Sequence, residues 1–244
     1  MGRIRVFAGP NGSGKSTLFQ QLQHTFNTGI FINADIIEQQ LSQSGLIDLN
    51  AYGIKASEED FEQFKQSPQA SSLIQKAISE KLDIDIGLRE NFIVDKSKSS
   101  HSYESALAAL FIRHLLIRKN KTFSYETVMS HRSKIAELTA AKEAGYRNYL
   151  YFVCTDDPLV NIQRVENRVE KGGHAVLDDK ISSRYYKTLD NLFDVIRVCY
   201  RTYLFDNSGT TMILIGEIFA DKLTMYTGQV PNWVQQHVLK HYVQ

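Results

Sequence analysis

One short segment constrains this sequence more than any other. Residues 9–17, Gly-Pro-Asn-Gly-Ser-Gly-Lys-Ser-Thr, satisfy the pattern Gly-x4-Gly-Lys-Ser/Thr in full. The segment follows an alternating β-branched and aromatic run, residues 3–8, and precedes apolar residues at helical spacing from about Lys15. Glycines in such a loop let backbone N–H groups turn toward an anion, and the following helix points its positive end at the same place. We call residues 9–17 the phosphate loop and predict that it binds ATP or GTP; a chance glycine-rich turn is the alternative.

Each residue of the phosphate loop is a candidate nucleotide contact. The Lys15 ammonium is expected to reach the β- and γ-phosphates, and Ser16 Oγ is expected to ligate Mg²⁺. The candidates are Gly9, Pro10, Asn11, Gly12, Ser13, Gly14, Lys15, Ser16 and Thr17.

Strand-like and helix-like segments alternate along the chain, which favours an α/β fold with a parallel sheet flanked by helices. Residues 45–100 break this alternation, and we interpret them as a helical insertion with helices from Ser57 and over residues 71–88. The last part, about 210–244, is predicted to be a short C-terminal extension. At roughly 150 residues per domain, 244 residues allow one large domain or two small ones. We predict a single P-loop kinase-like domain over residues 1–244.

The charge balance limits the classes of partner. The chain has 28 Lys and Arg against 27 Asp and Glu, a net charge of +1, so it lacks the overall charge that broad binding of nucleic acid or acidic membrane needs. Local patches remain compatible with this balance. No apolar run approaches about 18 residues, and we expect a cytoplasmic protein without a membrane or nucleic-acid partner. The two cysteines, Cys154 and Cys199, are too few for a disulfide framework and are predicted to be buried free thiols.

Two carboxylates follow predicted strands and are candidates for the acceptor side of the site. Asp35 comes directly after the second strand and is in position to accept the proton of an attacking hydroxyl; a helix N-cap is the alternative. Glu126 lies in the strand 122–128, where it would orient substrate or Mg²⁺-bound water; an exposed edge position is the alternative. Competing strand-terminal acids are Asp95 and the pair Asp156-Asp157, of which Asp157-Pro158 fits a helix N-terminus better.

A charged helix after Pro158 carries two arginines. Arg164 and Arg168 are four residues apart, so they share one helix face, and Gly172-Gly173 follow them. We interpret residues 159–184 as a lid that brings guanidinium groups onto a transferring phosphate; a solvated helix of mixed charge is the alternative. Arg184, on the next helix, is a further candidate. His174 is either a substrate contact or a helix cap.

In order along the chain, these pieces resemble the zeta toxin family of small-molecule kinases. Apart from the generic phosphate loop, the resemblance rests on short motifs distributed over most of the chain. They are Asn33-Ala-Asp35, Phe123-Ser-Tyr-Glu-Thr127, Ala141-Lys-Glu-Ala-Gly-Tyr146, Arg164-Val-Glu-Asn-Arg168, Gly172-Gly-His174, Arg184-Tyr185 and Asp206-Asn-Ser208. Residues 45–100 and those after about 210 are poorly covered.

The resemblance implies a kinase that phosphorylates a hydroxyl, in the best-known members that of UDP-N-acetylglucosamine. It implies that Asp35 is the catalytic base, with Lys15, Arg164, Arg168 and Arg184 stabilising the transferring phosphate. It also implies a substrate side formed by Asp35, Glu126, Thr127 and His174. The Gly-Gly-His and Arg-Tyr motifs are similar to those of chromosomal, zeta-like members and differ from the compact plasmid toxins. An antitoxin partner is compatible with this family, although no residue of the chain identifies one.

The leading hypothesis is therefore an ATP- and Mg²⁺-dependent kinase for a small hydroxylated acceptor, with a sugar nucleotide as the first guess. One alternative is a regulatory P-loop protein that binds or slowly hydrolyses nucleotide. Another is a kinase for a nucleoside, nucleotide or antibiotic. ATP and GTP are not distinguished by the sequence.

Overall fold

The computed structural model describes residues 1–97, 101–173 and 175–242. It divides into two units: unit 1 comprises Met1–Thr28 and Ser124–Gln244, and unit 2 comprises Gly29–Phe123. Each unit is described by itself. The expectation of one functional domain over the whole chain stays a prediction.

A mostly parallel sheet forms the centre of unit 1. Its strand order is β10-β9-β8-β7-β1-β6, in which β1, β7 and β8 run parallel and β8, β9 and β10 run antiparallel. The strands are β1 (Arg3–Ala8), β6 (Phe123–Thr127), β7 (Arg147–Cys154), β8 (Arg201–Asp206), β9 (Ile213–Phe219) and β10 (Lys222–Met225). The α/β fold with a mostly parallel, helix-flanked sheet is confirmed, and β10 is an additional edge strand that the sequence did not indicate.

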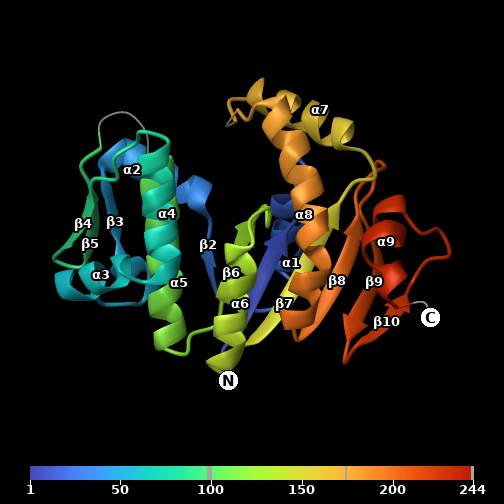
Figure 1. Ribbon diagram of the computed structural model, residues 1–244, viewed down its shortest axis with the longest axis horizontal. Coiled ribbons are helices and arrows are strands. Elements are labelled where there is room, and N and C mark those ends of the chain that lie inside the picture. Colours follow the sequence, from blue (N-terminus) through green and yellow to red (C-terminus); the bar gives the residue numbers. More distant parts are fainter. Residues whose placement is uncertain (98–100, 174, 243–244) are drawn as a thin grey trace. The chain divides into compact units, whose positions relative to one another are not determined.

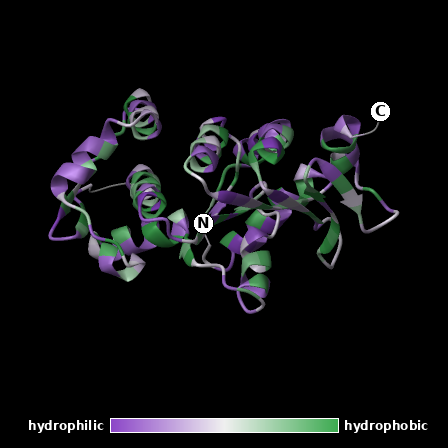
Figure 2. Ribbon diagram, turned by 90° about the horizontal axis from the view of Figure 1, so that it is seen from below, coloured by the Kyte–Doolittle hydropathy of each residue, from purple (hydrophilic) through white to green (hydrophobic). Residues whose placement is uncertain are grey.

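Helices flank this sheet (Figure 1). They are α1 (Lys15–Leu22), α6 (Ser133–Glu143), α7 (Pro158–Val169), α8 (Asp178–Val198) and α9 (Asn232–His237), followed by a 3₁₀ turn at Leu239–His241. Long helices such as α8 bury one side: Ile181, Tyr185, Leu189, Leu192 and Ile196 are all in the core. Figure 2 shows hydrophobic and hydrophilic residues alternating along the helices, as expected for amphipathic helices. The helices predicted from about Lys15 and after Pro158 are present as α1 and α7.

Unit 2 begins with β2 (Ile30–Ile32) and α2 (Ala34–Ser44) and ends with the long helix α5 (Ser102–Arg118). Between α2 and α5 the purely helical insertion is wrong in part. The segment contains a three-stranded antiparallel sheet in the order β3-β5-β4 as well as two helices. Its elements are β3 (Leu46–Asp48), a 3₁₀ turn (Leu49–Tyr52), α3 (Glu58–Lys65), α4 (Pro68–Ser79), β4 (Ile86–Arg89) and β5 (Phe92–Asp95).

The predicted helix over residues 71–88 shows why the helical prediction failed in this segment. Pro68 occupies the first turn of α4, where its missing N–H costs nothing, and Ser67 caps the helix. The helix then ends at Ser79, and Lys81 has a left-handed backbone with φ 59°. Residues Ile86 and Leu88 belong to β4 and are buried on one face with a period of two. A short apolar run does not distinguish the end of a helix from a short strand.

Candidate functional site

The phosphate loop connects β1 to α1, as predicted. Gly14 caps α1 with a left-handed backbone, φ 103°, and Lys15 is the first helical residue. A Cβ at Gly14 would lie 2.5 Å from Asn207 Nδ2, and one at Gly9 would collide with the Val153 carbonyl oxygen. Only glycine fits these two positions without a shift of its neighbours. The loop is thereby held close to β7 and to the segment after β8.

Two asparagines hold the loop from outside. Asn161 Nδ2, on α7, donates to the Asn11 carbonyl oxygen at 2.6 Å, and its Oδ1 accepts from Thr155 Oγ1. Asn207 Nδ2 donates to the Ser13 carbonyl oxygen at 2.8 Å. Buried carbonyls that are bonded in this way leave the loop N–H groups as donors for a phosphate.

Sequence reasoning missed the role of Asn161. Its side chain is 0% exposed on the same face of α7 as buried Val165. The spacing of four residues between Asn161 and Val165 was the available signal, because an asparagine on the buried face of a helix needs a hydrogen-bond partner. Asn207 was noticed only as part of a motif, and its contact depends on the fold.

Ser16 and Glu126 meet across the site. Ser16 Oγ donates to Glu126 Oε2 at 2.9 Å, although the two residues are 110 positions apart. Thr127, next to Glu126 at the end of β6, accepts a hydrogen bond from Gly9 N through its carbonyl oxygen at 3.3 Å. The end of β6 therefore lies beside the start of the phosphate loop. A hydroxyl and a carboxylate facing one another are oxygen donors of the kind that Mg²⁺ prefers when nucleotide phosphates supply further ligands.

Lys15 folds back onto its own loop. Its Nζ donates to the Pro10 carbonyl oxygen at 2.8 Å, so the ammonium lies over the loop at the N-terminus of α1. A bound phosphate would meet both the ammonium and the helix N-terminus there.

The arginine helix is confirmed as a helix, α7, and Gly172 follows it with φ 84°. Arg164 Nη2 donates to the Gly209 carbonyl oxygen at 3.2 Å, whereas its Nη1 is buried and has no hydrogen-bond partner among the described residues. A pocket of about 410 Å³ is lined by Arg164, Asn167, Arg168, Lys171, Gly172 and Gly173. Three of these side chains are cationic, which suits an anionic ligand.

Two lid candidates remain, Arg184 and His174. Arg184 is half-buried on α8. His174 lies outside the described residues, so its role stays a prediction.

Asp35 belongs to unit 2, where it is the second residue of α2 and exposed. The helix is capped by Asn33, whose Oδ1 accepts from Asp35 N at 2.9 Å and from Ile36 N at 3.4 Å. The alternative that Asp35 is itself the N-cap is therefore wrong, and its carboxylate is not used by the cap. Its role toward the phosphate loop stays a prediction.

The competing acids after β7, and Asp206 at the end of β8, have structural partners. Trp233 N donates to Asp156 Oδ1 at 3.1 Å, and Trp233 Nε1 donates to Asp206 Oδ1 at 2.9 Å. Asp157 caps α7 by accepting from Leu159 N at 2.8 Å, as predicted. These carboxylates attach α7 and the C-terminal helix α9 to the sheet.

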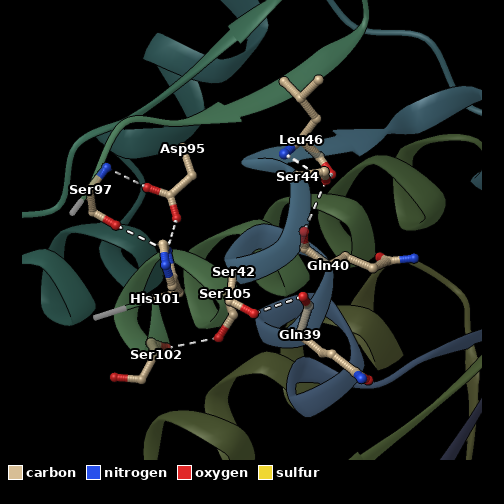
Figure 3. Close-up of polar contacts among 10 residues, drawn as sticks. All are labelled: Gln39, Gln40, Ser42, Ser44, Leu46, Asp95, Ser97, His101, Ser102 and Ser105. Carbon is tan, nitrogen blue, oxygen red and sulfur yellow. Dashed lines mark hydrogen bonds and ion pairs between the residues drawn. The ribbon is translucent and has the colours of Figure 1, made fainter. Parts of the chain in front are cut away.

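Asp95, at the end of β5, is occupied within unit 2. Figure 3 shows its carboxylate between Ser97 N, at 2.8 Å, and His101 Nδ1, at 2.6 Å. Ser97 Oγ contacts the same ring nitrogen at 3.2 Å. A catalytic triad needs its acid and its hydroxyl on different nitrogens of the histidine, so this cluster does not have that geometry.

Clustered metal-binding side chains and disulfides are absent from the part of the chain that the structure describes. Within it there is no group of three or more His, Cys, Asp and Glu side chains placed to bind a metal. Both cysteines are free. Burial raises the pKa of the Cys154 thiol, and that of Cys199 to about 12, so both are protonated at neutral pH. Across residues 1–97, 101–173 and 175–242, no helix is long and apolar enough to cross a membrane.

Comparisons with known proteins bear on the fold. No family model matches the chain. A chain in two crystal structures of the AvrRxo1-ORF1:AvrRxo1-ORF2 complex, one with sulphate ions and one with ATP, superimposes with a TM-score of 0.58 at 13% identity. The alignment with sulphate ions covers 93% of this chain and 62% of that chain. The two chains share a fold.

Two further comparisons were found. A structure of the PezAT chromosomal toxin-antitoxin system of Streptococcus pneumoniae aligns with a TM-score of 0.48 at 13% identity, covering 100% of this chain and 81% of that one. An uncharacterized protein of Haemophilus influenzae (strain ATCC 51907 / DSM 11121 / KW20 / Rd) is 30% identical over 77 residues, 32% of this chain and 55% of that protein. This chain thus spans little more than half the length of the curated relative.

Proposed function

We propose that the protein is a kinase that uses ATP and Mg²⁺ to phosphorylate a hydroxyl of a small acceptor. The observation that carries this proposal is the contact between Ser16 Oγ and Glu126 Oε2 at the N-terminus of α1. It pairs the hydroxyl of a phosphate loop with a carboxylate on a neighbouring strand, the donor set that a nucleotide-bound Mg²⁺ requires. A likeness of fold to a chain crystallised with ATP supports the choice of nucleotide.

The residues of unit 1 have separate tasks in this proposal. Backbone N–H groups of the phosphate loop and the Lys15 ammonium bind the β- and γ-phosphates. Ser16 and Glu126 would hold Mg²⁺, which neutralises phosphate charge when bound. Arg164 Nη1, without a partner among the described residues, and Arg168 supply planar donors to the transferring group, with Arg184 as a further donor.

Asp35 is the proposed base on the acceptor side. Its carboxylate takes the proton of the acceptor hydroxyl while that oxygen forms a bond to the γ-phosphorus. The bond from the γ-phosphorus to the bridging oxygen breaks, and ADP leaves with the electron pair. Thr127 and His174 complete the proposed acceptor contacts.

The acceptor is proposed to be UDP-N-acetylglucosamine or a related sugar nucleotide, and the partner an antitoxin protein. Both come from the ordered motifs shared with the zeta toxin family. The AvrRxo1 chain is found in a complex of two open reading frame products, which supports a protein partner for this fold.

The test is transfer of labelled γ-phosphate from ATP to a panel of sugar nucleotides, nucleosides, antibiotics and a metabolite extract. Asp35→Asn is expected to bind ATP as the wild type does and to lose about 10²- to 10⁴-fold in acceptor turnover. Lys15→Ala is expected to weaken ATP binding and to reduce acceptor turnover. The matched control is Glu38→Gln, one turn further along α2, which is expected to retain activity.

Labelled inorganic phosphate without a labelled acceptor, unchanged by Asp35→Asn, would contradict kinase action. That result would favour the regulatory P-loop alternative. A labelled nucleoside or antibiotic would keep the chemistry and replace the sugar nucleotide.

A further inference from the structure

Five side chains form a row across one face of the sheet of unit 1. The strand register places Arg5 beside Tyr149, Tyr149 beside Arg201, Arg201 beside Phe219, and Phe219 beside Lys222. Directly paired residues of neighbouring strands project to the same side of a sheet. Cations and aromatic rings therefore alternate over β1, β7, β8, β9 and β10, and we call these five residues the cation-aromatic row.

The row lies on a face that is covered at β1, where Phe19 of α1 packs on Phe7, and is more open over β8, β9 and β10. On the other face, Asn148 is bonded to α6 through the Leu138 carbonyl oxygen at 2.7 Å, and Phe152 packs against Trp233 of α9. On the face of the row, Tyr149, Arg201 and Phe219 are only half-buried and Lys222 is exposed, whereas Arg5 is buried, with its Cζ 5.1 Å from the centre of the Phe26 ring. Tyr200 packs beside them with 38% of its surface exposed, at 5.5 Å from the Tyr149 ring and 5.3 Å from the Phe219 ring.

Two guanidinium groups lie over aromatic rings of this face. Arg201 Cζ is 4.2 Å from the centre of the Phe219 ring, and Arg147 Cζ is 4.5 Å from that of Tyr200. A stacked guanidinium keeps its N–H donors in its plane, where they can bind an anion. The Arg201 Nε is buried and has no hydrogen-bond partner among the described residues. The Nη1 of the same guanidinium contacts the Tyr203 hydroxyl at 3.5 Å.

The charge of this face is unbalanced. Glu217 lies 3.7 Å from the Arg201 guanidinium. Against that carboxylate stand three half-buried or exposed cations, Arg147, Arg201 and Lys222, and the buried Arg5. The chain as a whole has a net charge of only +1, so the excess is local.

The net charge of the whole chain predicted no nucleic-acid partner, but from the local charge and aromatic rings of this face we propose that it binds single-stranded nucleic acid. Aromatic rings on an open sheet face stack on unpaired bases, and cations beside them bind the phosphates that connect those bases. Strands are about 4.8 Å apart, so the row presents aromatic rings about 10 Å apart with a cation between them. An acidic polypeptide would bind the cations, but it has no bases that could stack on the aromatic rings. The proposal goes beyond the kinase function and does not depend on it.

The experiment is fluorescence anisotropy of a labelled oligouridine of about 12 nucleotides, with the full chain and excess ATP to occupy the phosphate loop. The wild type is expected to bind with a Kd of about 1 to 100 µM at low salt. Tyr149→Ala is expected to weaken binding at least about fivefold through lost stacking. Arg201→Gln is expected to weaken binding and to lower the slope of log K against log salt by about one.

Controls separate this face from other causes. Arg197→Gln removes an exposed cation of α8 and is expected to leave oligouridine binding unchanged. Lys222→Gln changes an exposed side chain, so its effect on binding reports contact even if Tyr149→Ala unfolds the protein. Circular dichroism checks that each variant is folded.

The proposal fails if the wild type does not bind oligouridine up to about 100 µM at low salt. It also fails if Arg197→Gln weakens binding as much as Arg201→Gln and Lys222→Gln do. Binding of poly-L-glutamate without binding of oligouridine would replace nucleic acid by an acidic polypeptide and would equally overturn it.

Discussion

Single residues of the phosphate loop are fixed by steric limits. Gly14 combines a left-handed backbone with a distance of 2.5 Å between its missing Cβ and Asn207 Nδ2. A side chain there would strain the backbone and displace the amide that holds Ser13. Gly228 has neither constraint, because nothing lies within 4 Å of its missing Cβ and its φ is not positive.

Gly14→Ala is therefore expected to lower ATP affinity by at least about tenfold, since a strained left-handed residue costs about 1–3 kcal/mol. Titration with a fluorescent ATP analogue measures the change. Gly228→Ala is the control and should bind as the wild type does. Equal affinities of all three proteins would show that the loop tolerates a side chain at this position.

Asn161 is the second residue whose contacts define the site. Asn161→Ala would leave the Asn11 carbonyl and the Thr155 hydroxyl without their partner, a cost of about 1–3 kcal/mol. Because Asn161 is on the helix that carries Arg164, we expect KM for ATP to rise and kcat to fall together. Steady-state kinetics measure both parameters. The control is Asn232→Ala on α9, and a loss of stability without a kinetic change would assign Asn161 a role in folding alone.

At the scale of elements, α3 shows how a local sequence defines a helix start. Ser57 N and Oγ both donate to Asp60 Oδ2, at 2.9 and 3.0 Å, and Asp60 N donates back to Ser57 Oγ. This capping box satisfies N–H groups that the helix itself leaves unbonded. The hydrogen bond from the Ser57 backbone, and then that from its side chain, lower the pKa of Asp60.

The lowered pKa gives a pH-dependent prediction. A carboxyl with a lower pKa in the folded protein stabilises the fold above its unfolded pKa and loses this effect as pH falls through the folded value. Asp60→Asn is therefore expected to cost about 1 kcal/mol at neutral pH and progressively less below about pH 4. Urea unfolding of the wild type and the variant, at neutral pH and below about pH 4, measures the difference in free energy of unfolding. Glu59→Gln in the same turn should cost less, and a pH-independent cost of Asp60→Asn would contradict a carboxylate cap.

At the scale of elements, sequence patterns were sufficient to predict some helices and strands but not others. The composition of residues 3–8, 102–119 and 133–144 predicts a strand and two helices, and the structure has β1, α5 and α6 there. Residues 81–95 contain two four-residue strands, β4 and β5, which pair antiparallel with each other, and β5 also pairs with β3, which precedes α3 and α4 in the chain. Short strands are stabilised by their neighbours, so the sequence of each one does not define it.

At the scale of the whole molecule, nucleotide binding should stabilise the folded chain. A ligand that binds only the folded state at about 100 times its Kd adds about 2.7 kcal/mol, or roughly 5 to 10 °C in Tm for a chain of this length. Differential scanning fluorimetry with ATP and Mg²⁺ measures this shift. Ser16→Ala and addition of EDTA are expected to reduce it. Adenosine, which has no phosphates, is the control, and an equal shift with adenosine would contradict recognition through the phosphate loop.

The sequence alone determined the phosphate loop, because its glycine positions are a local requirement of backbone geometry and its strand and helix have local periods. It also determined the alternation that makes an α/β fold, and the helix that carries Arg164 and Arg168. Only the tertiary structure decided which side chains meet. Glu126 reaches Ser16, Asn161 reaches Asn11, and five strands align the cation-aromatic row. Such contacts arise from strand order and register, which no local pattern encodes.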